Sequence, residues 1–283
     1  LPFAEREPNS VELNALTGRY LLDADDFAHA ETLLARAHAV ALRSGGDAET
    51  QFQYGRLAFR KQEVENGISR IQQAIAAEPT RHRYRFELAQ SLTSLDRNEH
   101  RSAPKVAISQ LEYLVAHAPR FAAAKNPVDY LAEVHRRAAR LYADEARWEK
   151  AIPHLRTAHE LEPNHLETQV LLGTALFQVN DPDAEKVLRR VVAKRPNDGP
   201  AALYLGLTLI AGSRSSEALS FLERAAATRE PSCAVASYHA ALIYKDRNLL
   251  SKAAASLRTY LARAPADSPF RVDAKRLLDD VAH

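Results

Sequence analysis

Three histidines in one stretch, His154, His159 and His165, are the nearest that the sequence comes to a set of metal ligands. Two imidazoles on one helix bind zinc together when they lie three or four residues apart, on the same face. Here the spacings are five and six residues. The sequence therefore predicts no metal site at this stretch, and no other motif in it predicts a cofactor.

The acidic run DADD at residues 23–26 has the residue types of a calcium loop. It lacks the glycine and the distal glutamate that such a loop requires, and it lies where two predicted helices meet. We expect these carboxylates to cap a helix instead. The SGGD run at residues 44–47 falls in a turn and lacks the spacing of a phosphate-binding loop.

Cys233 and Trp148 are the remaining residues with distinctive chemistry. Cys233 is the single cysteine, so it has no partner for an internal disulfide, and its apolar surroundings predict a buried helix residue rather than a nucleophile. Trp148 begins a predicted helix, and we expect it to pack there rather than to bind a ligand. The sequence gives no support to catalysis, so we predict that the chain is not an enzyme.

Composition favours helices and excludes several classes of partner. Nine glycines and 7 % aromatic residues are few for an all-β fold. A net charge of +2, from 38 basic and 36 acidic residues, creates no field that would hold nucleic acid or an anionic membrane. The longest apolar stretch, residues 201–212, is shorter than the roughly 20 residues of a membrane span. Cysteine usage and the first residue leave cytoplasm and periplasm equally open.

The helices are expected to follow an internal repeat that the prolines mark. Pro163, Pro196, Pro231 and Pro265 lie 33, 35 and 34 residues apart. A small residue recurs ten positions after a proline, or at the same place in the one unit that has no proline, at Gly18, Gly55, Ala89, Gly173, Gly206 and Ala241. A second series of small residues follows about 12 positions later, at Ala30, Gly67, Ala151, Ala184, Ala218 and Ala253.

Each unit reads as two amphipathic helices joined by a short turn. The small residues mark where the paired helices approach most closely, because a larger side chain there would push them apart. The proline closes the second helix, since its ring cannot continue the hydrogen-bonding pattern and restricts the preceding residue.

This pattern resembles the tetratricopeptide repeat, a 34-residue helix-turn-helix unit. The resemblance implies an all-α, right-handed superhelix, or solenoid. Its predicted parts are the tail of a truncated upstream repeat (1–8), seven repeats (9–44, 45–80, 81–120, 127–164, 165–197, 198–231 and 232–266) and a capping helix (267–283). Insertions at 94–105 and 120–127 depart from the pattern, and we leave open whether they form a kink, a contact loop or tolerated surface loops.

In this family the first helices line a concave groove that holds a segment of a partner. One register, meaning the same set of positions applied to each first helix, predicts a groove that is basic and aromatic in its N-terminal half and apolar in its C-terminal half. The register also includes Val170 and Thr174. The predicted binding residues are Phe52, Arg56, Phe59, Arg83, Phe86, Arg136, Arg140, Phe177, Leu203, Leu207, Ile210, Tyr238 and Leu242.

Two alternatives to this groove stay open at the level of the sequence. The arginines could form salt bridges with acids of the same chain, such as Glu133 or Glu49. The apolar half could be covered by the C-terminal helix or by another subunit.

The predicted function is a non-catalytic scaffold that binds a protein or peptide segment, acidic and with apolar anchors. The alternative is the repeat region of a larger protein, such as a glycosyltransferase or exopolysaccharide export machinery, whose activity lies elsewhere. Nucleic acid binding is disfavoured, because the apolar fifth to seventh units lack a basic stripe. The asparagines that the family uses to clamp a chaperone's C-terminal carboxylate are also missing.

Overall fold

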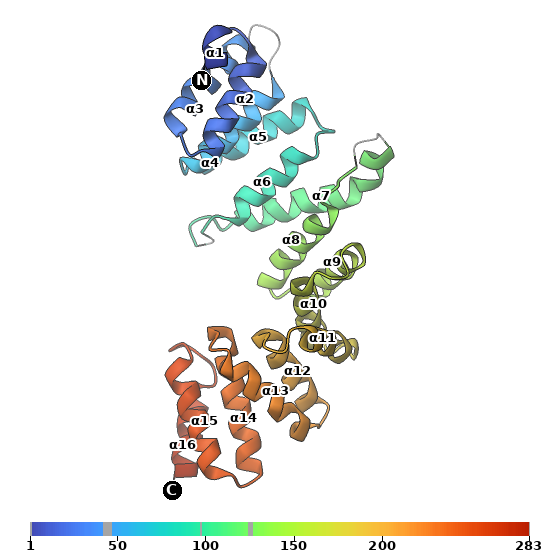
Figure 1. The fold of residues 1–283 in the computed structure, drawn as a ribbon, viewed down its shortest axis with the longest axis vertical. Coiled ribbons are helices and arrows are strands. Elements are labelled where there is room, and N and C mark those ends of the chain that lie inside the picture. Colours follow the sequence, from blue (N-terminus) through green and yellow to red (C-terminus); the bar gives the residue numbers. More distant parts are fainter. Residues whose placement is uncertain (1, 42–46, 97, 124–126, 283) are drawn as a thin grey trace. The chain divides into compact units, whose positions relative to one another are not determined.

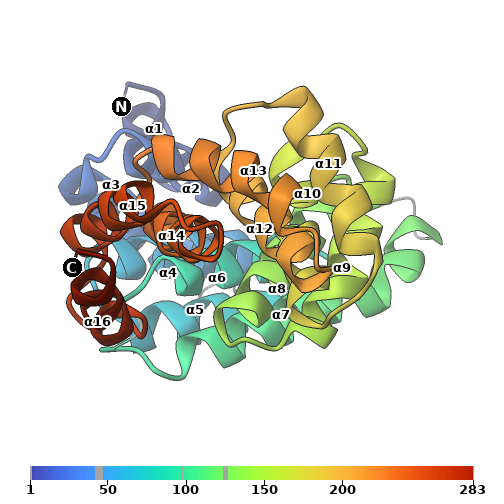
Figure 2. The ribbon, with the colours of Figure 1, turned by 90° about the horizontal axis from the view of Figure 1, so that it is seen from below.

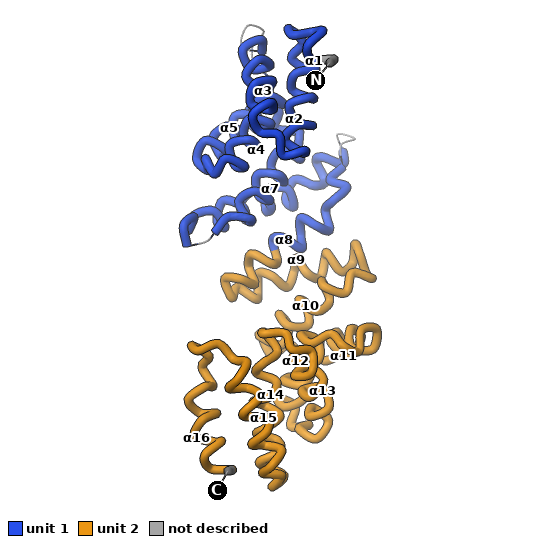
Figure 3. The backbone as a smooth tube through the Cα atoms, turned by 60° about the vertical axis from the view of Figure 1, so that its left-hand side comes forward, with its two compact units in different colours: residues 1–138 blue, residues 139–283 orange. Residues whose placement is uncertain are grey.

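The computed structural model describes residues 2–41, 47–96, 98–123 and 127–282, and all regular structure within these ranges is helical (Figure 1). Parts of the predicted turn at 44–47 and of the insertions at 94–105 and 120–127 lie outside the described residues, as do Leu1 and His283. The chain divides into two compact units, residues 1–138 and 139–283 (Figure 3).

Unit 1 is built from seven helices and the first part of an eighth, and the pairs α2 and α3, α4 and α5, and α6 and α7 pack against each other. The helix bounds are α1 (Pro2–Arg6), α2 (Val11–Asp23), α3 (Phe27–Ala41), α4 (Ala48–Arg60), α5 (Val64–Ala77), α6 (Arg83–Thr93), α7 (Ala103–Ala123) and α8 (Leu131–Asp144). The boundary between the units falls inside α8.

Unit 2 continues the alternation, with α10 packed on α11, α12 on α13, and α14 on α15. Its bounds are α9 (Trp148–Leu161), α10 (Leu166–Gln178), α11 (Asp183–Lys194), α12 (Gly199–Ala211), α13 (Ser215–Ala227), the 3-10 turn η2 (Pro231–Cys233), α14 (Ala234–Asp246), α15 (Leu250–Arg263) and α16 (Arg271–Ala282). Figure 2 shows α14, α15 and α16 beside one another.

The small residues of the repeat lie at the contacts between paired helices. A methyl carbon added to Gly206 would lie 2.8 Å from the side chain of Leu222, and one added to Gly173 would lie 2.6 Å from Leu188. Both distances are well inside van der Waals contact, so neither helix pair could keep its spacing with a larger residue. The repeat positions are therefore set by the close approach of α12 to α13 and of α10 to α11.

Prolines end most of the second helices, as the sequence predicts. Helices α1, α5, α9, α11 and α15 each end two residues before the prolines at positions 8, 79, 163, 196 and 265. Pro119 is the exception, and the prediction that it closes a helix is wrong, because α7 continues through it to Ala123. Burial favours this extension: Phe121 is 5 % exposed and its ring lies 5.3 Å from that of His82.

The same backbone motif joins the two helices in six of the repeats. The second residue after the first helix adopts a left-handed conformation, with φ between 54° and 64°. The next residue then donates its N–H to a carbonyl five residues earlier, as Arg147 does to Tyr142 at 2.8 Å, which terminates the helix. The left-handed residues are Asp25, Gln62, Ala146, Asn180, Ser213 and Asn248, and none of the six is glycine.

Candidate functional site

Unit 2 contains a groove of about 840 Å³ formed by the first helices α8, α10 and α12 and the segments next to them. It is lined by Arg140, Ala143, Asp144, Trp148, Glu167, Val170, Leu171, Thr174, Arg195, Pro196, Asn197, Asp198, Pro200, Tyr204, Glu230 and Ser232. This volume is within the range of sites that bury ligands of several residues or of drug size.

Two capping residues fix where the helices of the groove begin. At the start of α10, His165 Nδ1 accepts the backbone N–H of Thr168 at 3.2 Å. At the start of α12, an Asp198 carboxylate oxygen accepts the N–H of Ala201 at 3.0 Å. Both caps satisfy amide groups that the first helical turn leaves unpaired, so they hold these helix starts in place beside the groove.

Arg195 ties the turn between α11 and α12 to α10. Its guanidinium lies 2.5 Å from a carboxylate oxygen of Glu167 and 3.6 Å from one of Asp198. The hydrogen bond from Arg195 lowers the pKa of Glu167, so the pair is charged at neutral pH. This ion pair occupies Arg195 and makes it a wall of the groove rather than a cation free to bind a partner.

One side of the groove is apolar and aromatic. Val170 and Tyr204 are half-buried against the unit 2 core, and the Tyr204 ring lies 5.7 Å from that of Phe177. Burial raises the pKa of the Tyr204 hydroxyl, which is therefore neutral at physiological pH. Trp148, the only tryptophan of the chain, is half-exposed at the rim. These side chains provide contact surface for an apolar residue of a ligand.

Arg140 is the available cation of the groove. It is exposed and forms no ion pair with any residue in the described ranges. The groove as a whole is not basic, because four of its six charged lining residues are the acids Asp144, Glu167, Asp198 and Glu230. The arrangement can pair with one carboxylate of a ligand at Arg140, and it does not suit an acidic tract.

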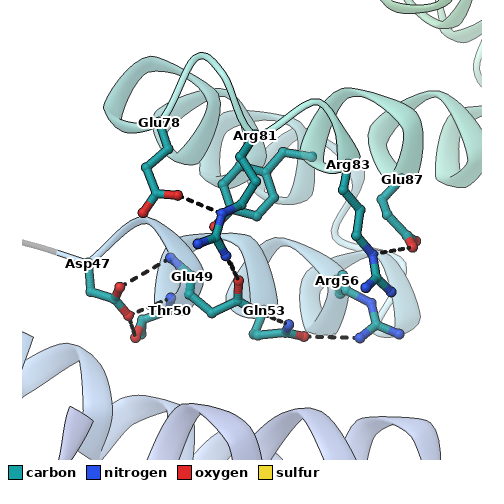
Figure 4. A network of polar contacts seen from close by, with 10 residues as sticks. Asp47, Glu49, Thr50, Gln53, Arg56, Glu78, Arg81, Arg83 and Glu87 are labelled. Atoms are coloured by element: carbon teal, nitrogen blue, oxygen red, sulfur yellow. Dashed lines mark hydrogen bonds and ion pairs between the residues drawn. The ribbon is translucent and has the colours of Figure 1, made fainter. Parts of the chain in front are cut away.

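The predicted basic half of the groove is neutralised inside unit 1, which corrects the sequence-based expectation. Arg56 lies 2.7 Å from Asp23, Arg83 lies 3.6 Å from Glu87 and Arg136 lies 2.8 Å from Glu133. Figure 4 shows Arg56 and Arg83 in a wider network with their polar neighbours. The alternative interpretation, in which Glu133 satisfies an arginine within the chain, is confirmed.

The predicted aromatic residues of unit 1 differ in their exposure. Phe52 is 3 % exposed and stacks on Tyr84 with ring centroids 4.6 Å apart, so its assignment to an open groove is wrong. Phe59 is half-buried and lines a small hollow of about 280 Å³ with Arg56. Phe86 is half-buried, lies 4.4 Å from the Tyr130 ring and lines a charged pocket of about 800 Å³ together with Arg83.

The predicted apolar residues of unit 2 are largely core residues. Leu203 is 4 % exposed and Tyr238 is 6 % exposed, which corrects their placement in an open groove. The C-terminal segment covers Tyr238: its hydroxyl donates to Asp273 at 2.5 Å, and its ring stacks 4.8 Å from that of Phe270. Three further predicted residues are half-buried against the same core, namely Leu207, Ile210 and Leu242.

Arg140 is thus the one residue of the predicted binding set that lines the unit 2 groove, with Val170 and Thr174 from the same register. Sequence reasoning missed Tyr204, and it assigned Trp148 to packing. The position of Trp148 could have indicated that it lines the groove, because a tryptophan at the start of a second helix lies beside the end of a first helix. Nothing in the local sequence distinguishes the exposed edge of Tyr204 from the buried Leu203 before it.

The residues whose types could do metal or nucleophilic chemistry lie in buried or helix-capping positions. His154 is buried with its ring 5.7 Å from that of Tyr142, and His165 caps α10. Asp26 accepts the backbone N–H of His29 at 3.3 Å, as expected of a cap. Cys233, at the end of the 3-10 turn η2, is fully buried as predicted, and burial raises the pKa of its thiol. The described part of the chain holds no cluster of three or more potential metal ligands.

Helix pairs stacked in succession define a helical solenoid. Residues 142–206 match the family model of the tetratricopeptide repeat. The chain is 13 % identical to the C-terminal part of a tetratricopeptide repeat protein from Cytophaga hutchinsonii, with a TM-score of 0.66 over 92 % of this chain and 98 % of that one. The helical solenoid fold predicted from the sequence is confirmed, and residues 142–206 are similar to the tetratricopeptide repeat, in agreement with the predicted resemblance.

Other comparisons agree on the fold. A tetratricopeptide repeat protein from Parabacteroides merdae is 13 % identical, with a TM-score of 0.56 and coverage of 96 % of this chain and 99 % of that chain. YrrB, described as having an unusual peptide-binding site, is 21 % identical, with a TM-score of 0.53 and coverage of 73 % and 97 %.

One curated relative is similar in sequence over a short region. ALBINO3-like protein 3, mitochondrial, from Arabidopsis thaliana is 32 % identical over an alignment of 95 residues, and the match covers 29 % of this chain and 17 % of that protein. The match thus spans less than a fifth of that relative. No helix within the described residues of our chain has both the length and the apolar character needed to cross a membrane.

Proposed function

We propose that this chain is a non-catalytic scaffold that holds a segment of another protein in the unit 2 groove. The observation that carries the proposal is a combination on the first helices of one unit: Arg140, which has no ion-pair partner among the described residues, lies beside an apolar wall that includes Val170 and Tyr204. First helices line the binding surface in the family, and a groove of about 840 Å³ is large enough for several residues of a peptide.

The charges of the groove narrow the class of ligand. An apolar or aromatic residue of the partner would pack against Val170, Tyr204 and Trp148, where burial of apolar surface supplies most of the affinity. A carboxylate of the partner, from a side chain or a chain terminus, would pair with Arg140. Because acids outnumber cations along the groove, we propose one carboxylate next to an apolar anchor, and not the acidic tract that the sequence favoured.

Trp148 makes the proposal directly testable, because it is the only tryptophan and it lies at the rim of the groove. Segments selected from a random peptide library are titrated into the protein while tryptophan emission is recorded. We expect a saturable change in emission, and selected sequences in which an apolar residue stands near an acid.

Two variants separate binding in the groove from binding elsewhere. Arg140→Glu replaces an attraction by a repulsion and should weaken binding about tenfold. The isosteric Val170→Thr should weaken it about threefold by placing a hydroxyl against the apolar anchor. Arg190→Glu, at an exposed position on α11, is the matched control and should leave binding unchanged. Equal affinity of all four proteins would refute the proposal.

A second candidate function is the repeat region of a larger protein whose activity lies elsewhere. It is favoured by the match to ALBINO3-like protein 3, in which the similar segment is 17 % of a longer chain. The coding sequence on either side of residues 1–283 tests it, because an adjoining catalytic or transport domain would support this candidate and stop codons on both sides would contradict it.

A further inference from the structure

Helix α2 carries a row of side chains that the structure leaves open to solvent. Leu16 is 61 % exposed and Tyr20 is 72 % exposed, and both rank among the most exposed large apolar residues of the described chain. With Glu12, which is also exposed, they are spaced four residues apart and so follow one face of the helix. We call Glu12, Leu16 and Tyr20 the α2 row.

The corresponding face of the next repeat, on α4, is a packing surface. Gly18 and Gly55 occupy the same repeat position, so Leu16 and Tyr20 correspond to Gln53 and Leu57 of α4. Those two residues are only 1 % and 2 % exposed. Leu57 belongs to the apolar cluster of α2 and α3, so in α4 this face packs against the preceding helix pair.

No described residue covers the α2 row in this way. The short helix α1 contributes Ala4 to the same cluster, where it packs with Leu21 and Leu22, but it leaves Leu16 and Tyr20 exposed. Within the described residues, a face with the position and apolar character of a helix-packing surface is therefore uncovered on α2. This face suits a helix as its partner, because helices cover the equivalent face of α4 in the next repeat.

The surroundings of the row are acidic. A hollow of about 480 Å³ next to it is lined by Glu12, Ala15, Leu16, Arg19, Asp47, Glu49, Glu78 and Arg81. Its two arginines are already engaged, since Arg81 lies 3.1 Å from Glu49 and 2.6 Å from Glu78, and Arg19 lies 3.9 Å from Asp23.

Glu12 has no ion-pair or hydrogen-bond partner among the described residues. Four carboxylates against two engaged guanidinium groups leave the hollow with a net negative charge that favours a cation. Figure 4 shows Glu49 and Glu78 meeting at Arg81, with Asp47 capping α4 beside them.

We propose that the α2 row and this hollow together form a docking surface for an amphipathic, basic helix of a partner protein. Apolar residues three and four positions apart on that helix cover Leu16 and Tyr20, and its lysine or arginine side chains reach Glu12 and the hollow. This docking surface lies in unit 1 and favours a positively charged partner, whereas Arg140 in unit 2 favours a carboxylate. It does not depend on the function proposed for unit 2.

Two synthetic helical peptides test the inference. Both carry leucines at positions i, i+3, i+4 and i+7, one with lysines and the other with glutamates at the flanking positions, and binding of a fluorescent label to the full chain is followed by anisotropy. We expect the lysine peptide to bind at least about tenfold more tightly and to weaken as salt rises. Equal affinity of the two peptides, or no binding of either, would overturn the proposal.

Variants at exposed positions locate the binding without disturbing the core. Leu16→Asn with Tyr20→Asn should weaken the lysine peptide about tenfold, and Glu12→Gln should weaken it about threefold and reduce its salt dependence. Val272→Asn is the matched control, because Val272 is an apolar residue of unit 2 that is 83 % exposed.

Two outcomes argue against the α2 row. Binding that survives the double substitution contradicts it. A wild-type dimer in light scattering that the same substitution abolishes would assign the row to a second copy of the chain instead. Trp148 emission monitors the unit 2 groove in the same samples, so failure of one site is distinguishable from failure of the other.

Discussion

Ala146 shows how single residues in the turns set the stability of the repeats. Its φ of 54° places a side chain in the left-handed region, where a Cβ atom is crowded and glycine is not. The conformation persists because the N–H of Arg147 then reaches the carbonyl of Tyr142 at 2.8 Å. The chain accepts local strain at this turn in exchange for a fixed end of α8.

Ala146→Gly should therefore stabilise unit 2 by about 1 kcal/mol, because it relieves that strain while keeping the turn. The matched control is Ala116→Gly, at an exposed position inside α7, which should destabilise by about 0.5–1 kcal/mol because glycine lacks helix propensity. Denaturant unfolding of both variants measures the difference. A loss of stability at Ala146 would contradict the strain argument.

Glu185 links stability to pH at the residue scale. Hydrogen bonds from Arg214 and then Arg189 lower the pKa of Glu185 below its ordinary value of 4.5. A carboxylate with a lowered folded-state pKa contributes stability that is present above about pH 4.5 and is lost as pH falls through the folded-state value.

Wild type should consequently be more stable than Glu185→Gln near neutral pH, and this advantage should shrink as the pH falls from about 5 to about 3. Melting temperatures of both proteins across that range test the sign. Raised salt should reduce the advantage, because Glu185 and its arginines are partly exposed. An advantage that grew on acidification would show that Glu185 does not act through these ion pairs.

At the scale of the helix pair, the small residues recur at a regular spacing because they lie where the two helices of each pair approach most closely. Gly206→Ala should destabilise the chain by about 1–3 kcal/mol, because the added carbon would lie 2.8 Å from Leu222. Gly212→Ala is the matched control, since the nearest atoms to its added carbon lie at an ordinary 3.6 Å. Thermal unfolding distinguishes them, and equal effects of the two substitutions would argue against a packing role for Gly206.

The same scale shows what the sequence could and could not predict. The helix pairs follow from glycine, alanine and proline positions, because sterics at those positions are local or involve the adjacent helix. Pro119 was misassigned because the burial of Phe121 depends on His82, which lies just before α6 and 39 residues earlier in the chain. Arg56 was assigned to a ligand because its partner, Asp23, lies 33 residues away in sequence.

At the scale of the molecule, the two units present surfaces of different chemistry. Unit 2 offers Arg140 beside an apolar wall, and unit 1 offers Leu16 and Tyr20 beside acids. The sequence predicted Arg140 as a partner-binding residue, and Arg140 lines the unit 2 groove, but the sequence could not predict that Tyr238 would be covered. That covering depends on Phe270 and Asp273, which precede and begin the last helix.

The central claim, that unit 2 holds a partner segment between its first helices, is tested most directly by hydrogen exchange. Amide exchange is measured across the full chain, free and saturated with a segment selected from a random peptide library. Our account predicts slower exchange in the bound state at the end of α8 and along α10 and α12, with no change in α2. Protection confined to unit 1, or to the second helices α11 and α13, would contradict it.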